Sequence, residues 1–256
     1  MIVNNIRNIG TIPSIGESPF ETLMRVVFGN GEDGCVLDPL VSSMWQDAAG
    51  TIAVTTDGDK VRRIDDISGN GNNATATSDS ERPTYRVNGG KPYLEFNGAQ
   101  SMVFNGTDLN FGQPSAHVGF HASANVQTII GWPHASTHIS PYYRMLIHTS
   151  NSERILSHWN GGSQLFSNAS VGWFAGNATA GSSPANGTFW ANGLAWGTAT
   201  AVSPITYPNN QPAILGRGAS NVDRFTGRLY GVAVFNRATV SADAVAIHNW
   251  LKNRYI

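Results

Sequence analysis

The sequence is short of charge, and this shortage limits what the chain can bind. Asp, Glu, Lys and Arg make up 13% of its 256 residues, about half the usual share, and the formal net charge is −1. Lys and Arg are scattered, so no basic run attracts phosphate backbones or anionic lipids. We therefore expect no nucleic-acid binding.

Cysteine and long apolar runs are also scarce. Cys35 is the single cysteine, so it forms no disulfide within the chain, and cysteine usage gives no sign of an oxidising compartment. No stretch approaches the roughly 18 consecutive apolar residues of a membrane helix. The start, MIVNNIRNIG, lacks a basic segment followed by an apolar one, so we expect synthesis in the cytoplasm and no membrane insertion.

Turn-forming residues instead divide the chain into short runs. From about residue 31 to residue 238, apolar or alternating runs recur every ten or so positions, which predicts an all-β, two-sheet antiparallel β-sandwich. Leu94 and Phe96 share one strand face while Glu95 points the other way. The nearly all-apolar run 229–235 predicts a central strand that is buried on both faces.

Two helices are expected outside the strands. Residues 1–16 indicate an extended arm, and Ser18-Pro19-Phe20-Glu21 is a capping box with Pro at the first helical position. Apolar residues then recur at helical spacing and are candidates for assembly contacts: Phe20, Leu23, Met24, Val27 and Phe28. Ser241 can cap a second helix through about Tyr255, with Ala244, Ile247 and Leu251 on one apolar stripe.

The first helix has two open roles. It either covers one end of the sandwich or, together with the arm, docks onto a neighbouring subunit. We assign residues 1–30 to the arm and amphipathic helix, and residues 31–256 to the sandwich with its closing helix. Homo-oligomers are common, but no heptad or collagen-like repeat specifies a copy number.

The acidic residues are badly placed for hydrolysis of a sugar polymer, which normally needs two carboxylates flanking one bond. Fourteen of the seventeen lie at or before Asp108, and only Glu153, Asp223 and Asp243 follow. No Gly-x-Ser-x-Gly elbow or phosphate-binding loop occurs, and no histidine lies near Cys35 in sequence. We predict no catalytic residues and no enzyme.

The histidines lack the acidic or thiolate partners that usually complete a metal site. Six of the seven histidines fall between His117 and His158, but no Cys, Asp or Glu accompanies them until Glu153. Carboxylates at four positions could supply calcium oxygens, although Asp57-Gly58 is also a natural turn: Asp57, Asp59, Asp65 and Asp66. We predict no metal or other cofactor, with calcium as the alternative.

Aromatic side chains near amides are the usual equipment of a sugar site, because a ring stacks on the apolar face of a pyranose while amides bond its hydroxyls. The candidates for glycan binding are Trp132, Tyr142, Tyr143, His158, Trp159 and Asn160. The competing interpretation is that these rings are buried in the core of the sandwich.

Two segments resemble known families. The stretch from Trp45-Gln46-Asp47 through Asp66-Ile67-Ser68-Gly69-Asn70-Gly71 to Leu94-Glu95-Phe96 is similar to one found in many bacteriophage tail and virion proteins. The stretch Gly227-Arg228-Leu229-Tyr230-Gly231-Val232, continued to Ala238 and the Ser241 helix, resembles the last strand and closing segment of laminin-G-like, concanavalin A-like domains.

The resemblance implies a jelly roll of the concanavalin A-like kind, carried by a virion and made in the host cytoplasm. It implies a non-enzymatic structural component, either a decoration protein or a tail-fibre-associated protein, with other capsid or tail proteins as partners. The alternative is a receptor-binding module that recognises glycans on the host surface. A polysaccharide-degrading enzyme is a third hypothesis, which the carboxylate positions disfavour.

Overall fold

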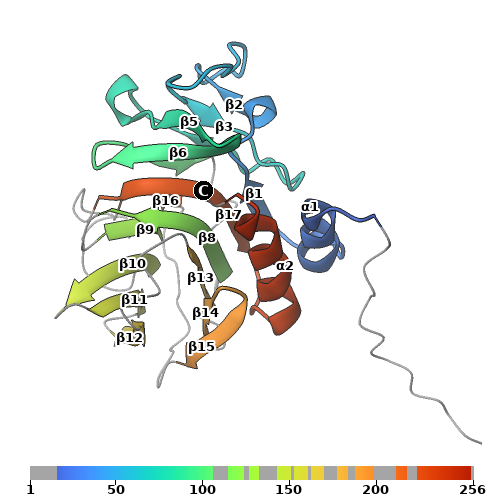
Figure 1. Ribbon diagram of the computed structural model, residues 1–256, viewed down its shortest axis with the longest axis vertical. Helices are drawn as coiled ribbons and strands as arrows, with labels where there is room; N and C mark the ends of the chain where they lie inside the picture. Colours follow the sequence, from blue (N-terminus) through green and yellow to red (C-terminus); the bar gives the residue numbers. More distant parts are fainter. Residues whose placement is uncertain are drawn as a thin grey trace, which may run out of the picture.

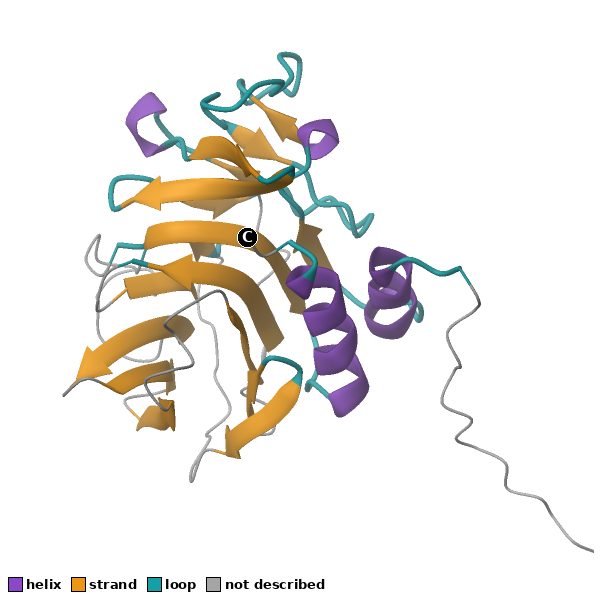
Figure 2. Cartoon of the chain, viewed as in Figure 1, coloured by secondary structure: helices purple, strands orange, loops and turns teal. Residues whose placement is uncertain are grey.

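The computed structural model describes residues 16–105, 115–123, 127–132, 143–150, 153–160, 163–169, 178–183, 188–198, 212–217 and 224–254. These residues form two antiparallel sheets that pack face to face, with two helices against one of them (Figures 1 and 2). The predicted all-β, two-sheet sandwich with a short N-terminal helix and a C-terminal helix is confirmed.

Sheet A carries the helices on its outer face. In order across the sheet, its strands are β15 (Leu194–Thr198), β14 (Thr188–Ala191), β13 (Ala178–Ser183), β8 (Ser115–Ala122), β17 (Thr226–Phe235), β6 (Lys91–Asn97) and β5 (Thr84–Asn88). The eighth strand, β1 (Gly34–Leu37), pairs with β17 on the same edge as β6. The predicted hairpin forms between β14 and β15, where Asn192 and Gly193 both have positive φ.

Sheet B forms the other layer. In order across the sheet, its strands are β12 (Ser163–Ala169), β11 (Glu153–Asn160), β10 (Tyr143–Ser150), β9 (Gln127–Trp132), β16 (Ile214–Leu215), β7 (Met102–Phe104), β4 (Ala74–Thr75), β3 (Arg63–Ile64) and β2 (Met44–Trp45). Two short 3-10 turns, η2 (Val41–Ser43) and η3 (Asp79–Glu81), interrupt the loops around β2 to β5. Phe96 and Phe120 of sheet A and Phe104 and Ile130 of sheet B belong to one buried cluster between the layers.

Strand β17 joins the two hydrophobic cores. One of its edges pairs with β8, and the other pairs first with β6 at Thr226–Leu229 and then with β1 at Val232–Phe235. Its residue Val234 lies in the core between the sheets, whereas Phe235 lies in a second cluster under the helices. The second half of the strand is therefore buried on both faces, as the run 229–235 predicts.

The N-terminal helix begins with the expected cap. Helix α1 (Pro19–Leu23) continues into a π-helical turn, η1 (Met24–Phe28). The Glu21 amide donates to Ser18 Oγ at 3.2 Å and the Ser18 amide donates to Glu21 Oε2 at 2.7 Å, so the capping box is complete. The helix ends at Gly29, where a Cβ would lie 2.3 Å from a backbone oxygen of the preceding turn.

The apolar residues of this helix pack against their own chain. Three of the five assembly candidates are at most 8% exposed, in a cluster with residues of β17 and helix α2 (Ser241–Lys252): Leu23, Val27 and Phe28. Phe20 and Met24 are partly buried at its margin. The helix therefore covers the sandwich, and its docking onto a neighbouring subunit stays a prediction.

Helix α2 lies beside α1 over the second half of β17 (Figure 1). The expected stripe of Ala244, Ile247 and Leu251 is buried. The predicted cap is wrong, because the N-cap position is Val240, and its amide donates to Asp243 Oδ2 at 2.9 Å. Ser241 is instead the first helical residue, and an acidic side chain in the first turn performs the capping.

Two glycines let α2 approach the sheet. Gly119 on β8 and Gly231 on β17 are direct partners in the pairing of these strands. A Cβ on Gly119 would lie 2.9 Å from Leu251, and one on Gly231 would lie 2.7 Å from Trp250. Larger residues at these two positions would push the helix off sheet A, so the covered part of the outer face depends on them.

Polar anchors hold the two ends of α2. Arg237 Nη2 donates to Asp243 Oδ1 at 2.8 Å at the start of the helix. At its end, Arg254 Nη2 donates to Asp38 Oδ2 at 2.6 Å and Trp250 Nε1 donates to the same oxygen at 3.2 Å. Burial raises the pKa of Asp38 to about 6, although the Arg254 charge acts in the opposite direction.

His117 is buried in the second core. Its Nε2 lies 2.9 Å from Thr239 Oγ1, and its ring stacks on Phe235 at 5.8 Å between centroids. Burial lowers the pKa of His117 to about 4, with a smaller opposing effect from Asp243. The folded protein therefore keeps this imidazole neutral at pH values where an unfolded chain would protonate it.

We predict that His117 makes the protein less stable as the pH falls from about 6.5 to about 4. Its pKa is lower in the folded state than in the unfolded state, so its contribution is complete above the unfolded pKa and is lost toward the folded one. The total is about 3 kcal/mol, at about 1.4 kcal/mol per pKa unit. Asp38, with a raised pKa, acts in the opposite direction over the same range.

The measurement is the free energy of unfolding in urea at pH 7.5 and pH 4.5 for the wild type and His117→Gln. The difference between the two proteins should shrink by a few kcal/mol at the lower pH, because glutamine does not titrate. His248→Gln is the control, since His248 is partly exposed and its change should be small. An equal difference at both pH values would show that the buried ring does not titrate as described.

Candidate functional site

Helix α2 leaves the outer face of the first half of β17 uncovered. It covers the second half of β17, where Gly231 faces Trp250 and Leu251. In the first half of the strand, Thr226 and Arg228 are partly exposed while Leu229 is buried in the main core. The open part of the face therefore spans β6, the start of β17 and the end of β8.

A pocket of about 280 Å³, here called the β6–β17 pocket, lies on this open half. Arg228 pairs directly with Glu95 on one neighbouring strand and with His121 on the other, and Thr226 pairs with Asn97. Directly opposed residues share a sheet face, so these side chains form two polar rows across three strands. The residues that line the pocket are Glu95, Phe96, Asn97, His121, Ser123, Thr226, Gly227 and Arg228.

The carboxylate of Glu95 is held by an arginine from the next strand. Arg86 on β5 donates from Nε to Glu95 Oε2 at 3.0 Å and from Nη1 to Asp57 Oδ2 at 3.2 Å. The hydrogen bond that Arg86 donates to Glu95 is the main cause of the raised pKa of Arg86. All three side chains are more than a third exposed, so these pairs add little to stability and mainly orient the groups.

The guanidinium of Arg228 lies over an aromatic ring. Its Cζ is 5.2 Å from the centroid of Tyr93, which in turn meets Tyr230 edge to face at 6.1 Å. Both tyrosines are 7% exposed or less. The arrangement fixes the direction of Arg228 and keeps its charge at the surface.

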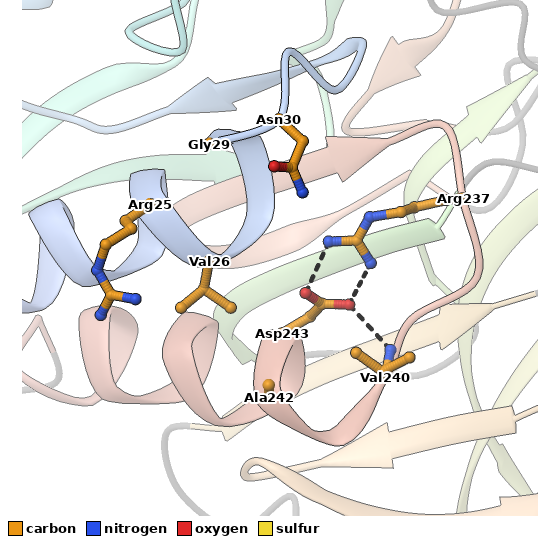
Figure 3. A pocket seen from close by; sticks show the side chains of 8 residues that line it. All are labelled: Arg25, Val26, Gly29, Asn30, Arg237, Val240, Ala242 and Asp243. Atoms are coloured by element: carbon orange, nitrogen blue, oxygen red, sulfur yellow. Dashed lines mark hydrogen bonds and ion pairs between the residues drawn. The ribbon is translucent and has the colours of Figure 1, made fainter. Parts of the chain in front are cut away.

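A second pocket, of about 610 Å³, lies between the N-terminal helix and the start of α2. Arg237 and Asp243 face each other there, and Asp243 also accepts from the Val240 amide (Figure 3). Arg237 Nε donates further to Glu32 Oε2 at 3.1 Å. Because these charged groups satisfy one another, this pocket is a structural junction and not our candidate site.

Of the predicted glycan-binding residues, Trp132 is the one whose side chain the structure describes. Trp132 is 1% exposed in the core between the sheets, so it cannot stack on a sugar, and this candidate is corrected. Tyr143 begins β10, and His158, Trp159 and Asn160 end β11, where the structure describes the backbone. Tyr142 lies outside the described residues.

Sequence reasoning missed Glu95 and Arg228 as site residues. The signal for Glu95 was its place between the buried Leu94 and Phe96, which turns it to the opposite face. The signal for Arg228 was a cation at the start of an otherwise apolar strand. Neither pattern tells which residues lie across the sheet, so neither could identify the pocket.

The aspartates considered as calcium ligands hold loops together. The Asp66 carboxylate accepts from the backbone amides of Val36, Ser68 and Asn72 at 2.8 to 3.0 Å. It therefore ties the Ser68-Gly69-Asn70-Gly71 loop to strand β1. Asp66 and the loop around it therefore have a structural role, because they help to position strand β1 of sheet A.

The other three aspartates are used in the same way. Asp57 accepts from the Val87 amide at 2.8 Å, and Asp59 accepts from two threonine amides at 2.9 and 3.0 Å. Asp65 accepts from the Trp45 indole at 2.7 Å. Within the described residues, no group of three or more His, Cys, Asp or Glu side chains could hold a metal ion, and no helix there is long and apolar enough to span a membrane.

Comparisons with known proteins identify the fold. No protein-family model and no curated protein sequence matches this chain. Domain 4 of AbnA, an extracellular GH43 arabinanase from Geobacillus stearothermophilus in complex with arabinotriose, is similar over 75% of this chain and 100% of its own, at a TM-score of 0.55 and 12% identity.

Two larger enzymes contain a similar structure. An arabinofuranosidase in complex with arabinofuranosyl-α-1,2-xylobiose matches 94% of this chain and 66% of its own, at a TM-score of 0.57 and 11% identity. A Trypanosoma rangeli sialidase in complex with 2,3-difluoro-KDN matches 91% of this chain and 39% of its own, at a TM-score of 0.51 and 11% identity. At these identities the likeness defines a shared β-sandwich fold, and the chain spans about two fifths of the sialidase.

We predict that Asp66→Asn destabilises the protein by about 1–3 kcal/mol, because one amide nitrogen replaces an oxygen that accepts partly buried hydrogen bonds. Thermal and urea unfolding measure the loss. Asp79→Asn is the matched control, since Asp79 is 82% exposed and should tolerate the change. The loss should be equal in calcium and in EDTA, and a loss seen only in calcium would make Asp66 a metal ligand.

Proposed function

We propose that the chain is a non-enzymatic component of a bacteriophage particle that displays a glycan-binding β-sandwich, with the β6–β17 pocket as its sugar site. The observation that carries the binding proposal is the polar lining of this pocket. Glu95, Asn97 and Arg228 bring an acceptor, an amide and a cationic donor to one open depression. Hydroxyl-rich ligands need this mixture of donors and acceptors.

The size and the fold support the same proposal. A volume of about 280 Å³ is near the lower end of ligand pockets, roughly 300–1,000 Å³, and suits one sugar unit. The arabinanase domain with a similar fold is in complex with arabinotriose. That ligand belongs to the other protein, and the β6–β17 pocket is the corresponding proposal for this chain.

The absence of catalysis is also a proposal. Among the residues that line the β6–β17 pocket, Glu95 is the one carboxylate, and it is bound to Arg86. Glycoside hydrolysis normally uses a second carboxyl group about 5–10 Å away across the bond. Binding a sugar, unlike hydrolysing it, needs no second carboxyl group.

The place in a virion rests on the resemblance of residues 45–98 to segments of phage tail and virion proteins. In this proposal the chain is made in the host cytoplasm, joins capsid or tail proteins, and forms a homo-oligomer. Residues 1–16 and the exposed edges of Phe20 and Met24 provide the attachment. A glycan on the host surface is then the natural target, which unites the structural and the receptor-binding hypotheses.

We predict that the purified protein binds glycans on an array of bacterial polysaccharides without releasing reducing ends. Arg228→Gln should weaken binding at least about 10-fold, about 1.4 kcal/mol, through loss of a charge-assisted hydrogen bond. Arg62→Gln, which removes a partly exposed arginine paired with Asp79 outside the pocket, is the control. Silence across the array, or equal binding by both variants, would contradict the proposed site.

We predict that antibodies to the sandwich label intact phage particles and that a chain lacking residues 1–16 fails to incorporate. The physical reason is that the sandwich itself buries Leu23, Val27 and Phe28, so these side chains are not available for attachment and the arm predicted from the sequence is the remaining candidate. Immunoelectron microscopy and particle proteomics provide the measurement. Normal incorporation of the truncated chain would rule out attachment through the arm.

A further inference from the structure

We infer that the β6–β17 pocket selects a neutral sugar, whose two adjacent hydroxyl groups bridge Glu95 on β6 and Arg228 on β17. The inference rests on the proposed function, since it concerns the ligand of the same pocket. It excludes uronic and sialic acids and amino sugars as preferred ligands.

The first step is the relation between the two charged side chains. Glu95 and Arg228 are direct partners in the β6–β17 pairing, so their Cβ atoms lie about 4.5–5.5 Å apart on the same face. Opposite charges in this position usually form an ion pair. Here Glu95 is bound by Arg86, and Arg228 lies over Tyr93, while among the described residues no ion pair joins Glu95 to Arg228.

Both Glu95 and Arg228 can still form hydrogen bonds with a ligand. Glu95 Oε2 accepts from Arg86 at 3.0 Å, and Oε1 has no hydrogen-bond partner among the described residues. The guanidinium of Arg228 has more donors than its contacts use, because it carries five N–H groups. A ligand placed between them therefore meets an acceptor on one strand and a donor on the next.

The third step is the chemistry of the ligand. A carboxylate only accepts hydrogen bonds and a guanidinium only donates them, whereas a hydroxyl does both. Adjacent sugar hydroxyls can thus donate to Glu95 and accept from Arg228 at the same time. A sugar carboxylate would satisfy Arg228 but place like charge against Glu95, and a sugar ammonium would do the reverse.

The fourth step is the charge balance around the pocket. Asp57 and Glu95 supply two negative charges, and Arg86 and Arg228 supply two positive ones. These four groups carry no net charge, so together they do not attract an ionic ligand of either sign over a neutral one at long range. Asn97, which is exposed on the adjoining row, adds an uncharged amide for a further hydroxyl.

The experiment compares three sugars that differ at one substituent: galactose, galacturonate and galactosamine, or the same series on the scaffold that the array identifies. Calorimetry measures the binding of each sugar to the wild type, Glu95→Gln, Arg228→Gln and Asp79→Asn. Asp79 is the matched control, because its carboxylate is exposed and does not line the pocket. Thermal unfolding verifies that every variant is folded.

The wild type should prefer the neutral sugar, with little dependence on salt concentration. Glu95→Gln should weaken the neutral sugar about 10-fold but strengthen the acidic one, because it removes the repelling charge. Arg228→Gln should weaken both. Asp79→Asn should change neither.

Two results would overturn the inference and are distinct from failure of the proposed function. Tighter wild-type binding of the acidic sugar would show that Arg228 recognises an anion, and tighter binding of the amino sugar would show that Glu95 recognises a cation. Binding of no sugar at all, or binding that neither pocket variant alters, would instead reject the pocket as a glycan site, and the selectivity inference with it.

Discussion

The pairing of β17 is the constraint on which the rest of the structure depends. Its second half contributes to both hydrophobic cores, with the main core on one face and the helices on the other. Its first half has the same buried inner face, but its outer face is open and carries Arg228. One strand thus contributes to the sandwich, to the surface under α2 and to the candidate site.

The loops around β2 to β5 support this arrangement from the other side. Asp66 accepts hydrogen bonds from backbone amides, and Asp57 accepts one from a backbone amide and one from Arg86. Both aspartates therefore hold the surrounding loops in place. Asp57 also helps to orient Arg86, which in turn holds Glu95 at the pocket. The loops before β5 are therefore tied to the edge of the site through hydrogen bonds, and the chain continues from them into β6, whose residues Glu95, Phe96 and Asn97 line the pocket.

Residue type alone does not tell whether an aromatic side chain is buried, so the aromatic residues did not predict the site. Trp132 has the composition signal of a sugar platform, yet it fills the core between the sheets. Tyr93 is also buried, but it supports Arg228 from below and so serves the pocket indirectly. In a chain with few charges, the polar pocket depends on two oppositely charged residues whose usual ion pair is replaced by other contacts.

Local patterns by themselves determined the sandwich, the capping box at Ser18, the turn at Asn192 and the burial of 229–235, because each depends on neighbours within a few residues. Strand order and register were decided only in the tertiary structure, since pairing joins segments far apart in the chain. The meeting of Glu95 with Arg228 is such a pairing. Alternation along β6 predicts the face of Glu95, but only the packed sheet determines its partner, and only the packing of α2 against the second half of β17 leaves this partner open to a ligand.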